Sequence, residues 1–111
     1  MALEEVRYHQ LADHTLNYLL KELDQFDPDE VEAFLSMGVL KVTFADKSVC
    51  VINSHAAARQ IWMAADNTAW HFSYDEKSSR WLCTRTGGEL FGLVSELLSK
   101  KMGTPIAIKA G

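Results

Sequence analysis

The segment G-V-L-K-V-T-F-A-D-K-S-V-C-V-I-N, residues 38–53, decides the fold. Its two runs at 39–44 and 49–52 are rich in β-branched and other apolar side chains, and the polar stretch 45–48 between them contains turn-forming residues. Gly38 permits a tight turn into the first run. The pattern predicts two antiparallel strands joined as a hairpin.

Strand-like runs continue on both sides of this hairpin. Residues 29–35 alternate inward-facing apolar side chains with Glu and Phe, which is typical of an edge strand. Residues 60–64, 70–74 and 80–84 carry aromatic and other strand-forming side chains between short polar turns. Because strands joined by short turns run antiparallel, we expect one antiparallel sheet of about five or six strands.

Two amphipathic helices bracket these strands. Residues 3–25 repeat apolar side chains at helical spacing, and Pro28 prevents the helix from continuing far beyond them. Residues 89–98 show the same spacing, and Gly103 provides a permissive helix end. Two helices placed in this way can lie side by side on one face of the sheet. The predicted fold is α+β, a two-layer α/β sandwich with the N- and C-terminal helices packed on one face of an antiparallel β-sheet.

The length of 111 residues is enough for one hydrophobic core, so we expect a single domain over residues 1–111 with loosely held ends at 1–7 and 104–111. Cys50 and Cys83 are far apart, and each lies within a strand-like run, which favours reduced core thiols over a disulfide. The sequence contains no stretch that could span a bilayer and no recognisable leader, which favours a bacterial-type cytoplasm.

Charge is distributed unevenly along the chain. Nine of the fifteen Asp and Glu residues fall within the first 32 positions, where only Arg7 and Lys21 oppose them. One strongly negative surface is therefore expected, which would attract cations or a basic partner protein and repel nucleic acid. Carboxylates on an edge strand also discourage unwanted sheet pairing, so composition alone favours a solvated acidic face without a ligand.

Carboxylates favour hard cations, and an added imidazole also admits ferrous or manganous ions. His9 and Asp13 lie one helical turn apart, and Asp24 falls on the same side of the predicted helix. These groups lie along a convex helix that Leu20 interrupts, so an open, hydrated and weak site is expected. The sequence contains none of the common phosphate-loop, zinc or nucleophile motifs, and no enzymatic activity is predicted.

The second face of the sheet has no covering layer in a chain of this length. Strand alternation places Trp62 on that face, where an exposed tryptophan is typical of a contact site. We expect Asn53, Gln60, His71 and Arg59 to flank it. The alternative is that Trp62 only covers its neighbouring strands.

The combined pattern resembles the frataxins, in particular the bacterial CyaY type, over about residues 8–98. The matching segments are Tyr8-His9-Gln10-Leu11-Ala12-Asp13, Gly38-Val39-Leu40, Val42-Thr43-Phe44, Val51-Ile52-Asn53, Gln60-Ile61-Trp62-Met63-Ala64, Trp70-His71-Phe72 and Arg80-Trp81. The resemblance implies the sandwich fold, weak and exchangeable surface binding of Fe²⁺ and Fe³⁺, and a role in iron–sulfur cluster assembly. The implied partners are a cysteine desulfurase and its scaffold protein, and the chain would be a monomer without iron.

Carried over residue by residue, the resemblance assigns two surfaces. The metal-binding acidic ridge comprises His9, Asp13, Glu22, Asp24, Asp27, Asp29, Glu30 and Glu32, with Glu4 and Glu5 as possible additions. The partner-binding sheet patch comprises Asn53, Gln60, Trp62 and His71.

The chain departs from the family pattern at several ridge positions. Phe34 and Leu20 stand where bacterial relatives often have acids, Gln25 replaces a common Asp, and Ala57 occupies the region of a common proline. We therefore expect fewer or weaker iron sites. Two other functions remain open, namely an iron-independent acidic module that modulates the desulfurase and, ranked last, a ferroxidase.

Overall fold

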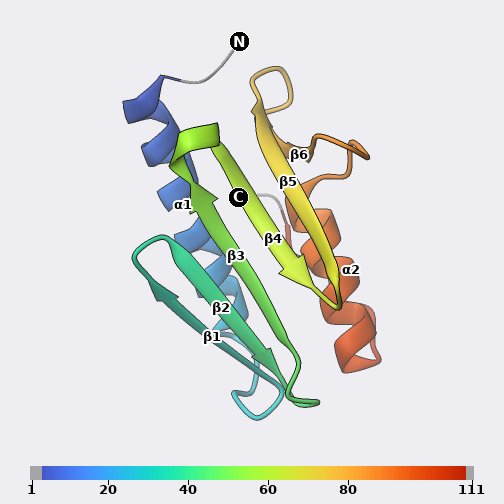
Figure 1. Cartoon of the computed structure of the whole chain (residues 1–111). Coiled ribbons are helices and arrows are strands. Elements are labelled where there is room, and N and C mark those ends of the chain that lie inside the picture. The colour runs from blue at the N-terminus through green and yellow to red at the C-terminus, as the bar shows by residue number, and fades with distance from the viewer. Residues whose placement is uncertain (1–3, 110–111) are drawn as a thin grey trace.

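The computed structural model describes residues 4–109. Its elements are α1 (Glu5–Leu23), β1 (Val31–Ser36), β2 (Val39–Phe44), β3 (Val49–His55), the 3₁₀ turn η1 (Ala56–Ala58), β4 (Gln60–Ala65), β5 (Thr68–Asp75), β6 (Arg80–Cys83) and α2 (Leu90–Met102). The six strands form one sheet in the order β1-β2-β3-β4-β5-β6, and each neighbouring pair is antiparallel (Figure 1). Every connection in the sheet is therefore short, as the turn signals predicted.

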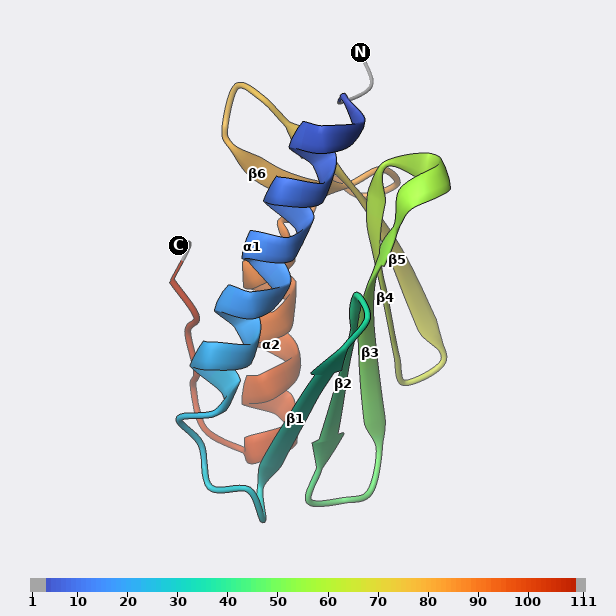
Figure 2. The same cartoon turned by 90° about the vertical axis from the view of Figure 1, so that its left-hand side faces the viewer.

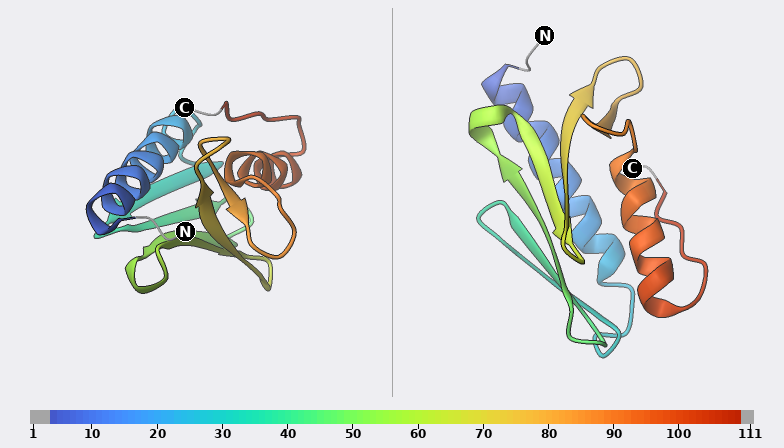
Figure 3. Two further views of the ribbon diagram at one scale, coloured as in Figure 1. Left: turned by 90° about the horizontal axis from the view of Figure 1, so that it is seen from above. Right: turned by 45° about the vertical axis from the view of Figure 1, so that its right-hand side comes forward.

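Both helices cover the same face of the sheet, which leaves the opposite face open (Figures 2 and 3). The core lies between these layers, and its larger fully buried side chains include Tyr8, Leu16, Leu19, Leu40, Ile52, Ile61, Met63, Phe72, Leu90 and Leu98. They follow the period of their own element, which is about 3.6 residues in the helices and two in the strands. The predicted two-layer α+β sandwich is confirmed.

The connection from α1 to β1 is shaped by Asp27. The helix ends at Leu23, two residues earlier than predicted, and Asp24 caps it by donating its N–H to the Leu20 carbonyl at 2.9 Å. The Asp27 carboxylate then accepts the N–H of Asp29 at 2.9 Å, a local turn in which the side chain replaces a backbone acceptor. This turn brings the chain from the end of α1 to the edge of the sheet.

The ends of the described chain are held more firmly than the sequence suggested. Residues 5–7 form the first turn of α1 rather than a loosely held end. At the other end, Ile108 is 8% exposed, and its N–H donates to the Ser95 hydroxyl at 2.8 Å. The Tyr18 hydroxyl donates to the Lys109 carbonyl at 2.5 Å, so the tail contacts both helices on the side away from the sheet (Figure 3). Residues 1–3 and 110–111, also expected to be loose, lie outside the described residues.

Both cysteines are free and buried, as predicted. Burial raises the pKa of the Cys50 thiol to about 12, with the negative charge of Asp66 adding to the effect. A thiol in this state is a poor nucleophile and a poor metal ligand at neutral pH. In addition, neither α1 nor α2 combines the length and apolar character that a bilayer-spanning helix needs.

Lys101 joins three segments that are distant in sequence. Its ammonium group lies 2.9 Å from an Asp66 carboxylate oxygen and 3.3 Å from one of Asp46, and its side chain is only 10% exposed. It also lies 5.6 Å from the centre of the Phe44 ring. The hydrogen bonds raise the pKa of Lys101, mainly through Asp66, and the Lys101 ammonium is the main cause that lowers the pKa of Asp66. Lys101 therefore ties the end of α2 to the β2–β3 and β4–β5 turns.

Replacing Lys101 by Met should destabilise the fold in a pH-dependent way. The pKa of Asp46 is lowered to about 2, first by Ser48 and then by Lys101. A lowered carboxyl pKa contributes stability above its unfolded value of roughly 4, and that contribution is lost as the pH falls toward about 2. The raised pKa of Lys101 has the opposite pH dependence. Its contribution to the stability of the fold is present at lower pH and is lost as the pH rises above roughly 10.5.

Thermal unfolding should therefore show that Lys101→Met has a midpoint temperature a few degrees below that of wild type at neutral pH. This difference in midpoint temperature should become smaller in acid and in strong alkali. Lys100→Met is the control, because Lys100 is 73% exposed and, among the residues that the structure describes, makes a single ion pair, at 3.6 Å. An equal effect of both variants at every pH would contradict this account.

Candidate functional site

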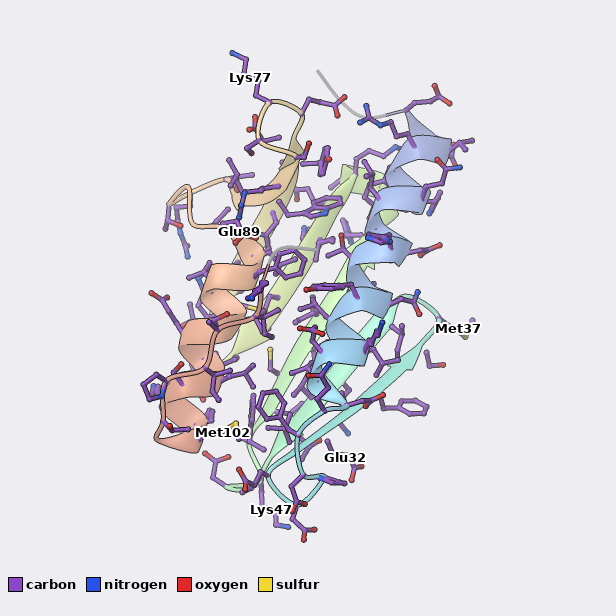
Figure 4. All side chains as sticks on the ribbon, turned by 180° about the vertical axis from the view of Figure 1, so that it is seen from behind. Glu32, Met37, Lys47, Lys77, Glu89 and Met102 are labelled. Atoms are coloured by element: carbon purple, nitrogen blue, oxygen red, sulfur yellow. The ribbon has the colours of Figure 1, made fainter. Side chains whose placement is uncertain are left out.

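The predicted acidic ridge lies on three consecutive segments. Asp13 and Glu22 are on α1, four acids lie in the connection or at its start, and Glu32 lies on β1 below the end of α1 (Figures 2 and 4). Asp13 and Asp24 lie about 16 Å apart along the helix axis, because an α-helix rises by about 1.5 Å per residue. The ridge thus divides into an upper pair and a lower cluster. The upper pair is His9 and Asp13, and the lower cluster is Glu22, Asp24, Asp27, Asp29, Glu30 and Glu32.

The ridge carboxylates lack counter-ions. Within residues 4–109, no Lys, Arg or His nitrogen lies within 4.0 Å of a carboxylate oxygen of Asp13 or of the lower cluster. Four acids outside the ridge differ, since Asp46, Asp66, Glu76 and Glu89 each form an ion pair with a basic side chain. The negative potential of the ridge is therefore not cancelled locally, and it favours cations or a basic surface.

Within residues 4–109, most ridge side chains also make no hydrogen bond. Two of them are exceptions. The Asp27 carboxylate accepts the N–H of Asp29, and the Glu22 carboxylate accepts a hydrogen bond from the Gln25 amide at 3.2 Å. In the described part of the chain, no group of three or more His, Cys, Asp and Glu side chains is placed so that it could hold a metal ion by itself. This donor set fits a hydrated cation at the surface, with much of its coordination supplied by water, and does not fit an enclosed site.

The His9 imidazole lies beside Glu5 in the structure. Its Nε2 lies 4.0 Å from Glu5, one turn earlier, and its ring packs edge-on against Tyr8 with centroids 5.2 Å apart. Glu5 is also approached by Arg59 at 3.8 Å, so its charge is partly compensated. The upper end of the ridge is consequently less negative than the lower cluster.

The four predicted patch residues meet on the open face of the sheet. Asn53, Trp62 and His71 occupy one row across β3, β4 and β5, paired in register. Gln60 lies two residues before Trp62, accepts the indole N–H at 2.8 Å and donates to the Ser73 hydroxyl at 3.2 Å. These hydrogen bonds fix the tryptophan in one orientation.

Trp62 is on the predicted face but is not freely exposed. His55 stacks on one side with ring centroids 3.7 Å apart, and His71 stacks with Trp62 at 4.1 Å, with interplanar angles of 17° and 8°. Trp62 is therefore half-buried, and its exposure was overestimated. Arg59 was expected beside it but extends toward Tyr8, where its guanidinium lies 5.9 Å from the ring centre.

His55 is the member of this patch that sequence reasoning missed. The strand predicted over residues 49–52 leaves His55 in a connection, whereas it ends β3 and pairs with Gln60 across η1. Two-residue periodicity from Asn53 would have placed it on the same face, beside Trp62. The missing information was the length of β3, because the sequence analysis ended this strand at Ile52.

Comparison with known proteins agrees with the order of helices and strands. A family model described as the frataxin-like domain matches residues 1–104. The chain belongs to the frataxin family. The iron–sulfur cluster assembly protein CyaY of Pseudomonas fluorescens Pf0-1 is 34% identical over 104 residues, which cover 94% of each chain. The CyaY protein of Azotobacter vinelandii is 33% identical over 103 residues, which cover 93% of each chain.

Solved frataxins share the same fold. Frataxin from Psychromonas ingrahamii superposes with a TM-score of 0.85 at 19% identity, covering 97% of this frataxin and all of that chain. A trimeric frataxin from the yeast Saccharomyces cerevisiae, complexed with ferrous iron, superposes with a TM-score of 0.69 at 27% identity. That match covers 94% of this frataxin and 90% of the yeast chain.

Proposed function

We propose that this frataxin acts in iron–sulfur cluster assembly, where it binds iron weakly on its acidic ridge and regulates or supplies a cysteine desulfurase and its scaffold protein. The observation that carries the proposal is the set of ridge carboxylates without counter-ions. The names of the CyaY relatives support the proposed role in iron–sulfur cluster assembly, and the ferrous complex of the yeast protein supports the proposed iron binding.

Weak binding follows from the geometry of the lower cluster. Each exposed carboxylate can supply one or two oxygens, and water must complete the coordination sphere of Fe²⁺ or Fe³⁺. An ion held in this way exchanges rapidly, which suits a protein that passes iron to another. The described residues do not gather the donors of a preorganised di-iron centre, so we do not propose ferroxidase activity.

An iron-independent docking role is the second candidate. The carboxylates are spread over three segments rather than focused on one point, and a spread of charge suits a broad basic surface as well as an ion. The sheet patch of Asn53, Gln60, Trp62 and His71, now with His55, would be a further contact for the same partner complex. In this role, the removal of iron would leave desulfurase binding unchanged.

An anaerobic titration with Fe²⁺, followed by two-dimensional NMR, tests the primary proposal. Paramagnetic broadening should appear first at Asp24, Asp29, Glu30 and Glu32, and at higher iron concentrations at Asp13. Purified desulfurase should compete with iron for the lower cluster. Even broadening over all acids, including the exposed Glu96 on α2, would contradict a ridge site.

A further inference from the structure

The β1–β2 hairpin exposes three large apolar side chains. Phe34 is 66% exposed, Met37 98% and Val39 43%. Met37 lies at the tip of the hairpin and projects away from the body of the molecule (Figure 4). Adjacent exposed apolar groups of this kind are typical of contact surfaces, because they contribute little to the stability of the monomer.

Met37 also has an unfavourable backbone conformation. Its φ is +51°, in the left-handed region that side chains other than Gly, Asn and Asp rarely adopt. Asn or Gly would form the same turn at lower cost, and the nearly complete exposure of Met37 gives the fold no compensating burial. A strained, exposed apolar residue is better explained by a contact outside the chain than by folding.

Phe34 lies between the two candidate binding surfaces. On β1 it shares the outer face with Glu32, and it pairs with Lys41 on β2. From the same hairpin, Val39 pairs with Asn53, which pairs in turn with Trp62. The hairpin thus connects the lower cluster of the ridge to the sheet patch through a surface that carries the apolar Phe34 and Val39 and the exposed Lys41.

We propose that Phe34 and Met37 form an apolar anchor that inserts into an apolar hollow on a basic partner protein, and that the ridge, the hairpin and the sheet patch form one continuous docking surface. This inference rests on the proposed function, in which the partner is the desulfurase complex. Glu32 shares the outer face of β1 with Phe34, and Glu30 directly precedes that strand; neither has a counter-ion within residues 4–109, which favours a partner with positive charge around the hollow. A second copy of this chain is disfavoured, because pairing two β1 edges would bring these carboxylates together.

Two substitutions at one position separate the anchor from simple charge attraction. Phe34→Ser removes the apolar group, and Phe34→Glu replaces it with an additional acid. We expect both to weaken binding to the purified desulfurase by about 10- to 100-fold in calorimetry, as for a central apolar contact. The loss should persist at high salt, and Phe34→Glu should bind weakly despite its extra negative charge.

Val6→Ser is the matched control, because Val6 is 61% exposed but lies on the first turn of α1, outside the hairpin. It should bind like wild type. Thermal unfolding should confirm that all three variants are folded, since the replaced side chains are exposed.

Three outcomes would overturn the inference. Tighter binding of Phe34→Glu at low salt would mean that charge alone governs docking, which leaves the proposed function intact. A change seen only in sedimentation of the isolated protein would identify a second copy as the occupant. If neither the Phe34 variants nor neutralised ridge acids alter desulfurase binding, the proposed docking role itself fails.

Discussion

Neutralising Asp24, Glu30 and Glu32 together, as Asp24→Asn, Glu30→Gln and Glu32→Gln, is expected to lower desulfurase affinity by about 100-fold at low ionic strength. None of these carboxylates forms an ion pair or a side-chain hydrogen bond within residues 4–109, so the change removes charge without breaking a contact of the fold. Each charge at such an interface contributes roughly 1 kcal/mol when it meets a basic partner and salt is low. The loss should appear mainly in the association rate.

Salt dependence distinguishes this effect from misfolding. The Debye length is about 30 Å at 0.01 M and about 3 Å at 1 M, so the triple variant and wild type should converge as salt is added. Glu32→Gln and Glu96→Gln form a matched pair, because each replaces one exposed glutamate by glutamine and only Glu32 belongs to the ridge. Equal affinities for the two would mean that net charge, rather than the ridge, controls binding.

The sheet patch requires a separate variant. Trp62→Ala removes the ring between His55 and His71 while leaving every ridge carboxylate in place. If the patch touches the partner, affinity should fall and should stay low at high salt. Unchanged affinity would remove Trp62 from the interface.

The fold could be predicted from sequence because its signals are local. Strand alternation placed the apolar side chains of β1 inward, and short turns required each strand to pair with the next, so the order of the sheet followed directly. The C-terminal tail was misjudged although Ile106 and Ile108 alternate with exposed neighbours. Their binding site is the surface of two packed helices, which exists only after the fold has formed.

The placement of a candidate site could be anticipated where neighbouring residues in the sequence carry it, but not where distant elements meet. Charge counting indicated an acidic N-terminal region, and the lower cluster that the resemblance assigns follows one continuous stretch from α1 to β1. The environment of Trp62 depends instead on η1, where Arg59 adopts a left-handed conformation and sets His55 opposite Gln60. Helical spacing places His9 one turn from both Glu5 and Asp13, and only the side-chain rotamers bring its Nε2 to 4.0 Å from Glu5.

Trp81→Ala is expected to have the largest effect on stability, lowering the free energy of unfolding by about 3–5 kcal/mol. Trp81 is 3% exposed, its indole N–H donates to the Thr15 hydroxyl at 3.0 Å, and its ring packs edge-on against Tyr8 and Tyr74. These contacts join α1 to β6, so the substitution leaves a cavity between the layers and a buried hydroxyl without its partner. Because domains of this size are stable by only about 5–15 kcal/mol, the variant should be close to unfolding at physiological temperature.

Chemical denaturation followed by far-UV circular dichroism measures this loss without relying on tryptophan fluorescence. Trp81→Phe keeps a six-membered aromatic ring but loses the N–H and part of the buried ring volume, while Thr15→Val removes the acceptor, and each should cost about 1–3 kcal/mol. The double variant should be less destabilised than the sum of the two, because neither orphaned group then remains. Strict additivity would show that the hydrogen bond does not couple α1 to the sheet. A loss below about 1 kcal/mol for Trp81→Ala would mean that other contacts hold the ridge-bearing helix in place.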